Sequence, residues 1–137
     1  MTLKFLGETT PENLEKVKSK LSKVQFQKFE AKLGNTGIFS YDGAPRIVWI
    51  KLLGKINILQ KEIDSVLEEL FPKESRFMSH TTIARIKYVK DVQAFKEYVK
   101  NIPTKKLKFE VNEFKLMKSE LNNFSPNYEM IEEYKLK

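Results

Sequence analysis

Residues 79–85 of the chain read Ser-His-Thr-Thr-Ile-Ala-Arg, and their β-branched members favour a β-strand. Side chains two positions apart on a strand share a face, so His80 and Thr82 are expected to point the same way. His80 is the only histidine of the chain, and imidazole is the side chain best suited to proton transfer near neutral pH. A neighbouring hydroxyl can hold a phosphate oxygen. The pair therefore predicts a site where a proton is moved beside a phosphate.

The first eight residues, Met-Thr-Leu-Lys-Phe-Leu-Gly-Glu, repeat part of this pattern. Thr2 is followed by an aliphatic residue, as Thr82 is, and the segment predicts a short strand over residues 2–6. When His-x-Thr-x is laid over it, the histidine falls one position before Met1.

The two segments resemble the paired motifs of the two-histidine (2H) phosphoesterases, and within them the RNA 2′,3′-cyclic phosphodiesterases, also called 2′-5′ RNA ligases. The first family motif reads like H-x-T-L-K-F-L-G-E and the second like H-x-T-L-A-R. The chain matches the second at His80, Thr82 and Arg85, and the first from Thr2 to Glu8 without its histidine. Further family-like runs stand at residues 37–39, 45–49 and 118–121 with Tyr128, so the resemblance covers the whole chain.

This resemblance implies hydrolysis of 2′,3′-cyclic phosphate ends of RNA or nucleotides to 2′-phosphates, with 2′-5′ ligation as the reverse reaction. It implies that His80 is one of two catalytic imidazoles, the one that activates water, and that Thr82 and Thr2 bind the phosphate from opposite sides. Arg85 is implied as a phosphate or substrate contact. Strict alternation would put Arg85 on the face opposite His80, so it would reach the site only from a strand end or a bulge. Two groups with a pKa near the operating pH need no metal and no cofactor for this reaction.

The amino-acid composition restricts the classes of protein to which the chain can belong. The 137 residues suffice for one domain with a core, and 41% of them are hydrophobic. The chain has no cysteine and a single histidine, which excludes disulfides and a histidine-rich metal cluster. No apolar run reaches membrane length and no signal peptide is recognisable, so we expect a cytoplasmic protein. The net charge of +7 favours a polyanionic partner, RNA above all.

Four aromatic and two basic side chains are further candidates for contacts with substrate. An aromatic ring on a strand is a candidate for stacking a base, although such rings are more often part of the core. We expect the tryptophan to be core. The two basic residues either add positive potential to the site or are surface charges without a role. These residues are Phe39, Tyr41, Trp49 and Phe77, and Lys4 and Arg46.

Apolar periodicity predicts three helices and several strands. The helices are expected over residues 11–24, with Thr10 as N-cap, over 56–70 and over 91–99, with Asp91 as N-cap. Strands are expected over 2–6, 28–33, 47–53, 79–85, 107–116 and 128–136, with turns at 34–37 and 41–44 and a loop at 122–127. This order predicts an α+β fold with largely antiparallel sheet. The resemblance adds two lobes with helices on the outside and a central cleft between the two His-x-Thr strands.

The family normally places a strand, a helix and a further strand segment before its first motif, roughly 30–40 residues. We therefore expect residues 1–137 to be a single domain that is incomplete at its N-terminus, as from a translation start assigned too late. A naturally shortened protein, either monomeric or dimeric through the incomplete lobe, is the alternative. Two other functions stay open: a catalytically impaired module that binds RNA ends, and an unrelated basic α+β protein of the ribosomal kind.

Overall fold

The computed structural model describes residues 1–121 and 126–137, and its architecture is α+β with antiparallel sheets, which confirms the predicted fold class. The helices are α1 (Pro11–Leu21), α2 (Ile56–Val66) and α3 (Val92–Lys100). The strands are β1 (Phe29–Tyr41), β2 (Ala44–Leu53), β3 (His80–Arg85), β4 (Lys108–Val111), β5 (Glu113–Leu121) and β6 (Pro126–Lys135).

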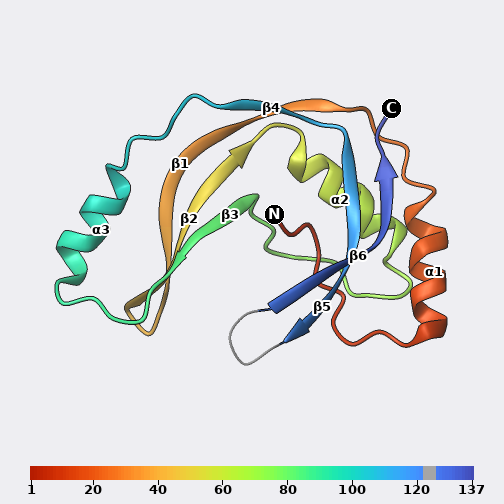
Figure 1. Cartoon of the computed structure of the whole chain (residues 1–137), viewed down its shortest axis with the longest axis horizontal. Helices are drawn as coiled ribbons and strands as arrows, with labels where there is room; N and C mark the ends of the chain where they lie inside the picture. The colour runs from red at the N-terminus through yellow and green to blue at the C-terminus, as the bar shows by residue number, and fades with distance from the viewer. Residues whose placement is uncertain (122–125) are drawn as a thin grey trace.

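The main sheet has the order β3-β2-β1-β4, and β5 and β6 pair as a separate two-stranded sheet. Figure 1 shows an elongated molecule in which the long strands β1 and β2 curve as an arch between α3 at one end and α1 at the other. The two strands are joined by a tight turn at Asp42 and Gly43, both with positive φ. That turn was predicted, and the Asp-Gly pair suits a two-residue hairpin loop.

The helix starts follow local rules. The Thr10 hydroxyl accepts a hydrogen bond from the Asn13 amide at 3.3 Å, and the Asp91 carboxylate accepts one from the Ala94 amide at 2.9 Å. Both predicted N-caps are therefore confirmed. Helix α2 ends at Val66, four residues before the predicted end, and the chain continues through turns in which Leu67 stays buried.

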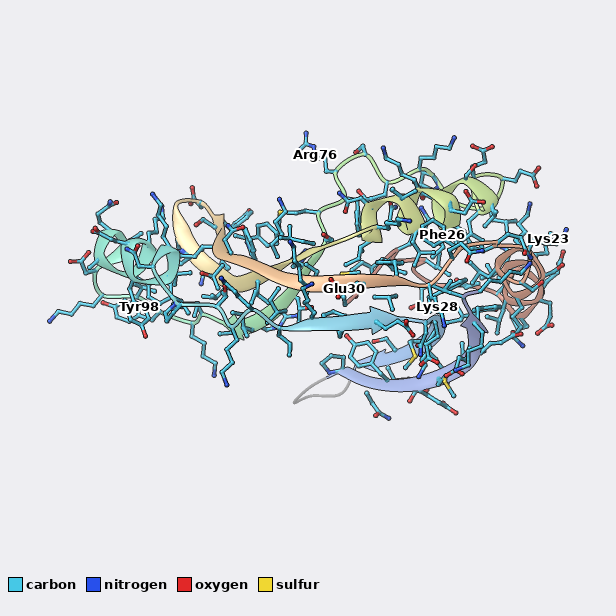
Figure 2. All side chains as sticks on the ribbon, turned by 90° about the horizontal axis from the view of Figure 1, so that it is seen from above. Lys23, Phe26, Lys28, Glu30, Arg76 and Tyr98 are labelled. Carbon is cyan, nitrogen blue, oxygen red and sulfur yellow. The ribbon has the colours of Figure 1, made fainter. Side chains whose placement is uncertain are left out.

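One hydrophobic core lies at the α1 end of the molecule. Seen from above, α2 lies on one side of β1 and the β5–β6 hairpin on the other (Figure 2). The core draws on α1, α2, the adjoining ends of β1 and β2, and both strands of the hairpin. Its members include Val17, Leu21, Phe29, Ala31, Leu52, Ile56, Leu59, Ile63, Leu67, Phe114, Leu116, Tyr134 and Leu136.

The main sheet has one face covered by helices. Residues directly opposite on paired strands share a face, and Leu33, Thr36 and Ile38 of β1 pair with Leu52, Ile50 and Val48 of β2. Leu52 belongs to the core with α2, and the Thr36 hydroxyl donates to the Val99 carbonyl of α3 at 2.6 Å. Helices α2 and α3 therefore cover this face. The alternate residues, including Trp49 and Lys51 of β2, point to the other face.

Three sequence predictions of local structure are wrong. Residues 34–37 are not a turn: β1 runs through them with a bulge, because Gly34 and Asn35 together oppose the single residue Lys51. Residues 2–6 are not a strand, because they have no strand partner in the part of the chain that the structure describes. The predicted strand over 107–116 is two strands, β4 and β5, which belong to different sheets.

The expected loop at 122–127 is only partly covered. Pro126 and Asn127 belong to β6, and the other four positions lie outside the described residues.

Candidate functional site

His80 opens strand β3 and lies on the face that the helices leave uncovered. It pairs with Lys51, which alternates with Trp49 on that face of β2. The Nδ1 atom of His80 lies 2.8 Å from the Met78 carbonyl oxygen. A carbonyl only accepts, so Nδ1 carries the hydrogen and donates it. The neutral ring then presents an unprotonated Nε2, which is the form a general base needs.

Aromatic rings pack beside His80. The Phe39 ring meets the imidazole edge-on, with 5.0 Å between centroids and 87° between planes. The centroids of the Phe39 and Trp49 rings are in turn 5.5 Å apart. The Trp49 indole covers Gly37, where a Cβ would come within 2.2 Å of the ring. Gly37 therefore makes room for Trp49, and Phe39 helps fix the orientation of the imidazole. The expectation that Trp49 is part of the core is wrong, because the indole is half-buried beside Phe39 and does not belong to the core cluster.

Thr82 and Arg85 reach the same face as His80. Thr82 pairs with Trp49, and Arg85 pairs with Ile47, so both point to the face on which Trp49 lies. The register shift between these pairs leaves Ile83 as an extra residue on β3. Regular alternation would have put Arg85 on the opposite face, and this bulge puts it on the same face as His80. Thr82 and Arg85 are both exposed.

Lys51 is the candidate that the sequence analysis missed. It lies directly opposite His80 on β2, where Cβ atoms of paired residues are roughly 4.5–5.5 Å apart. It forms no ion pair within residues 1–121 and 126–137. The available signal was a single lysine inside an otherwise apolar strand, residues 47–53, which a regular alternation places on one face with Trp49.

Thr2 is exposed, and no hydrogen bond joins it to β3 among the described residues. Its segment is anchored elsewhere. The Lys4 ammonium pairs with the buried carboxylate of Asp64 in α2 and donates to the Pro72 carbonyl at 2.7 Å. The expectation that Lys4 adds positive potential to the site is therefore wrong, because Asp64 neutralises its charge.

The buried ion pair also holds the approach to β3. Asp64 accepts a hydrogen bond from the Glu74 amide at 2.7 Å, in the loop that leads to His80. Burial alone would raise the pKa of Asp64, but the hydrogen bonds from Lys4 and from the Glu74 amide outweigh it and hold the pKa below its ordinary value. Asp64 is thus a carboxylate at neutral pH, and it ties residues 2–8 to the segment before β3.

The other sequence candidates differ in how far they are buried. Arg46 and Tyr41 are exposed, and Phe77 is half-buried against the core. No group of three histidine, aspartate or glutamate side chains is placed to hold a metal ion in the described part of the chain. The longest helices of the described residues, α1 and α2, have 11 residues each, too few to span a membrane.

Comparison with known proteins gives one consistent family. The family model described as "LigT like Phosphoesterase" matches residues 1–49 and 52–127. A relative named RNA 2′,3′-cyclic phosphodiesterase from Archaeoglobus fulgidus is 33% identical over 132 residues, which cover 93% of this chain and 74% of the relative. A relative of the same name from Methanocaldococcus jannaschii is 32% identical over 138 residues, covering 98% of this chain and 78% of the relative.

A solved structure agrees with the sequence comparison. A crystallised protein of Thermus thermophilus superposes with a TM-score of 0.81 at 27% identity, covering 98% of this chain and 76% of that protein. The matched residues include both the segment around Thr2 and the strand of His80. The chain belongs to the LigT-like phosphoesterase family.

Proposed function

We propose that this protein binds RNA that ends in a 2′,3′-cyclic phosphate and hydrolyses the end to a 2′-phosphate. The observation that carries the proposal is the arrangement around His80: an imidazole with Nδ1 bound to a carbonyl, and Thr82, Arg85 and Lys51 on the same face. Relatives that are about one-third identical bear the name of this activity.

His80 is the general base of the proposed reaction. Its Nε2 removes a proton from water as the water oxygen attacks phosphorus, the bond from phosphorus to the ribose 3′ oxygen breaks, and that oxygen gains a proton from a general acid. The product is a 2′-phosphate with a free 3′ hydroxyl. If a ribose 5′ hydroxyl took the place of water as the nucleophile, the same cleavage of the bond to the 3′ oxygen would form a 2′-5′ linkage, and we include this ligation in the proposal.

The neighbouring groups suit the charge on phosphate. Arg85 and Lys51 supply positive charge from β3 and β2, and the Thr82 hydroxyl donates to a non-bridging oxygen. For Thr2 we propose the same role from the opposite side, which requires its segment to approach β3 when the phosphate is bound. We propose that residues 1–137 act as one domain and that the cytoplasm, where RNA is found, is its location.

A second candidate function follows from one observation: His80 is the only histidine of the chain. With the base present and no second imidazole, the face would still hold a cyclic phosphate end without fast turnover. Loss of one member of an acid–base pair typically reduces the rate about 10²–10⁴-fold. The chain would then be an RNA-end-binding module.

One experiment separates the two functions. We would measure hydrolysis of adenosine 2′,3′-cyclic phosphate by the chain, by a variant with a histidine placed directly before Met1, and by a control with alanine there. If the protein is an enzyme, we expect a 2′-phosphate product. The rate of hydrolysis should then rise at least tenfold with the added histidine and should not rise with alanine. Tight binding of cyclic phosphate with no turnover in any of the three proteins would favour the binding module. If none of them binds or hydrolyses the cyclic phosphate, both candidates are wrong.

A further inference from the structure

The face that carries His80 continues beyond the site toward the β1–β2 hairpin. Phe39 and Tyr41 are two residues apart on β1. The nearby bulge lies on the partner strand, where Arg46 of β2 is the extra residue, so β1 keeps its regular alternation between Phe39 and Tyr41. Their side chains therefore share a face. Since Phe39 lies against His80, Tyr41 extends the same face away from the imidazole.

Tyr41 is much more open to solvent than the aromatic residues beside His80. It is 77% exposed, compared with 37% for Phe39, and Trp49 is half-buried on Gly37. Helix α3 packs on the opposite face of the sheet through Val99, so it does not cover Tyr41. A large ring is thus held at the end of a strand with its surface free.

Three basic residues, Arg46, Arg85 and Lys87, belong to β2, to β3 and to the segment after β3 at this end of the sheet. Arg85 lies on the His80 face through its pairing with Ile47. Beyond β3 the chain stays next to β2: the Ile86 amide donates to the Arg46 carbonyl at 2.8 Å, and the Arg46 guanidinium donates to the Lys87 carbonyl at 3.5 Å.

The charge of these residues is not neutralised by ion pairs. Among the described residues Arg46, Arg85 and Lys87 form none, whereas the lysines of β5 and β6 at positions 115, 118 and 135 all pair with glutamates. The nearest carboxylates in sequence are Asp42, in the hairpin turn, and Asp91, which caps α3. This corner of the molecule therefore presents net positive charge beside an exposed ring.

We propose that Tyr41, with Arg46, Arg85 and Lys87, forms a binding site for the single-stranded RNA that precedes the reacting phosphate. Exposed aromatic rings among basic side chains are the combination that binds single strands, by stacking bases and by attracting the backbone. An acidic protein would use the charge but would give the ring no base to stack. The proposal rests on the proposed function for its direction, because the cyclic phosphate at His80 fixes which end of the RNA lies there.

The geometry predicts which substrates reach Tyr41. His80 of β3 lies opposite Lys51 of β2, and Tyr41 of β1 lies opposite Ala44 of β2. Lys51 and Ala44 are seven residues apart, so the two positions are separated by at most about 23 Å along the direction of β2. The Phe39 ring, 5.0 Å from the imidazole, is close enough for the base of the terminal nucleotide. Tyr41 lies two residues farther, roughly 7 Å, and so it meets the base of a preceding nucleotide. An oligonucleotide contacts Tyr41, and a mononucleotide does not.

The test compares binding of three probes to the 137-residue chain at low salt. The probes are adenosine 2′,3′-cyclic phosphate, a fluorescein-labelled ten-nucleotide oligo(A) ending in a 2′,3′-cyclic phosphate, and the same oligonucleotide ending in a 3′ hydroxyl. Each is measured with the wild type and with Tyr41→Ala and Tyr41→Phe. Tyr98→Ala is the matched control, because Tyr98 is 70% exposed on α3 (Figure 2).

We expect Tyr41→Ala to raise Kd for both oligonucleotides at least about five-fold, the minimum for loss of one stacked base. Binding of the cyclic mononucleotide should change less than two-fold, Tyr41→Phe should bind like the wild type, and so should Tyr98→Ala. The proposal is overturned if Tyr41→Ala leaves oligonucleotide binding within two-fold, or if polyglutamate of equal charge competes as well as oligo(A). A different outcome would contradict the proposed function and not this site. In that outcome the wild type binds the two oligonucleotides equally well, so the cyclic phosphate adds nothing, while Tyr41→Ala still weakens the binding of both.

Discussion

The pair formed by Lys4 and Asp64 allows a quantitative test of how residues 2–8 are held. The two side chains are 6% and 8% exposed, so they are shielded from water. Removing one partner of a buried ion pair costs about 3–5 kcal/mol, because the other charge is left buried and unpaired. Within residues 1–121 and 126–137, Lys4→Met leaves Asp64 the Glu74 amide as its one hydrogen-bond partner, and Asp64→Leu leaves Lys4 the Pro72 carbonyl. We expect each single variant to lose about 3–5 kcal/mol of unfolding free energy.

The double variant Lys4→Met/Asp64→Leu should recover most of this loss, because neither charge then remains in the buried site. Urea unfolding followed by circular dichroism measures all four proteins and gives the coupling between the two positions. A coupling below about 1 kcal/mol, or a single variant as stable as the wild type, would refute the reasoning.

The same pair predicts a pH dependence. The pKa of Asp64 is held below its ordinary value of 3.8 in the folded state. A lowered folded-state pKa contributes stability that is present above pH 3.8 and is lost as the pH falls through the folded-state value. Relative to the double variant, the wild type should therefore lose stability on acidification below about pH 4. A difference that stays constant from about pH 6 to about pH 2.5 would contradict this assignment.

Three further substitutions test the site itself. His80→Ala should abolish hydrolysis of cyclic phosphate and change unfolding free energy by less than about 1 kcal/mol, because the ring lies at the open face; a melting temperature far below that of the wild type would make the histidine structural. Thr82→Val keeps a β-branched side chain on the strand, and it should weaken binding of the cyclic mononucleotide by about ten-fold or more through loss of one hydrogen bond to a charged group; unchanged Kd would remove Thr82 from the site. Gly37→Ala places a Cβ 2.2 Å from the Trp49 ring and should cost about 1–3 kcal/mol by overpacking. Its control is Gly34→Ala on the same strand, where the new atom meets only side-chain atoms at 3.2 Å or more, and equal stability of the two variants would refute the packing argument.

Local features of the fold were predictable because they depend on neighbours in sequence. The capping residues Thr10 and Asp91 mark helix starts with their own side chains, and the turn at Asp42 and Gly43 needs only two residues of the right kind. The segment around Thr2 shows the limit of such rules. Its composition suits a strand, but a strand forms only when another strand pairs with it.

The orientation of site residues depends on register, which the sequence does not specify locally. Alternation alone put Arg85 on the wrong face, and only the extra residue Ile83 brings it to the face that carries His80. Lys51 was missed for the same reason, because its place opposite His80 exists only through the pairing of β2 with β3. Lys4 was assigned to the site by charge, although a carboxylate 60 positions away neutralises it.

The bulge at Ile83 has a second consequence, for self-association. Strand β3 is the last strand on its side of the described sheet, so its outer edge offers unpaired backbone groups to any other strand. A regular six-residue edge would invite pairing between molecules and hence aggregation. The extra residue bends β3 in the middle and interrupts the row of groups that a second strand would need. The irregularity that puts Arg85 on the face of His80 therefore also protects an open edge, and a chain without Ile83 would be more prone to aggregate even where its remaining residues pair normally.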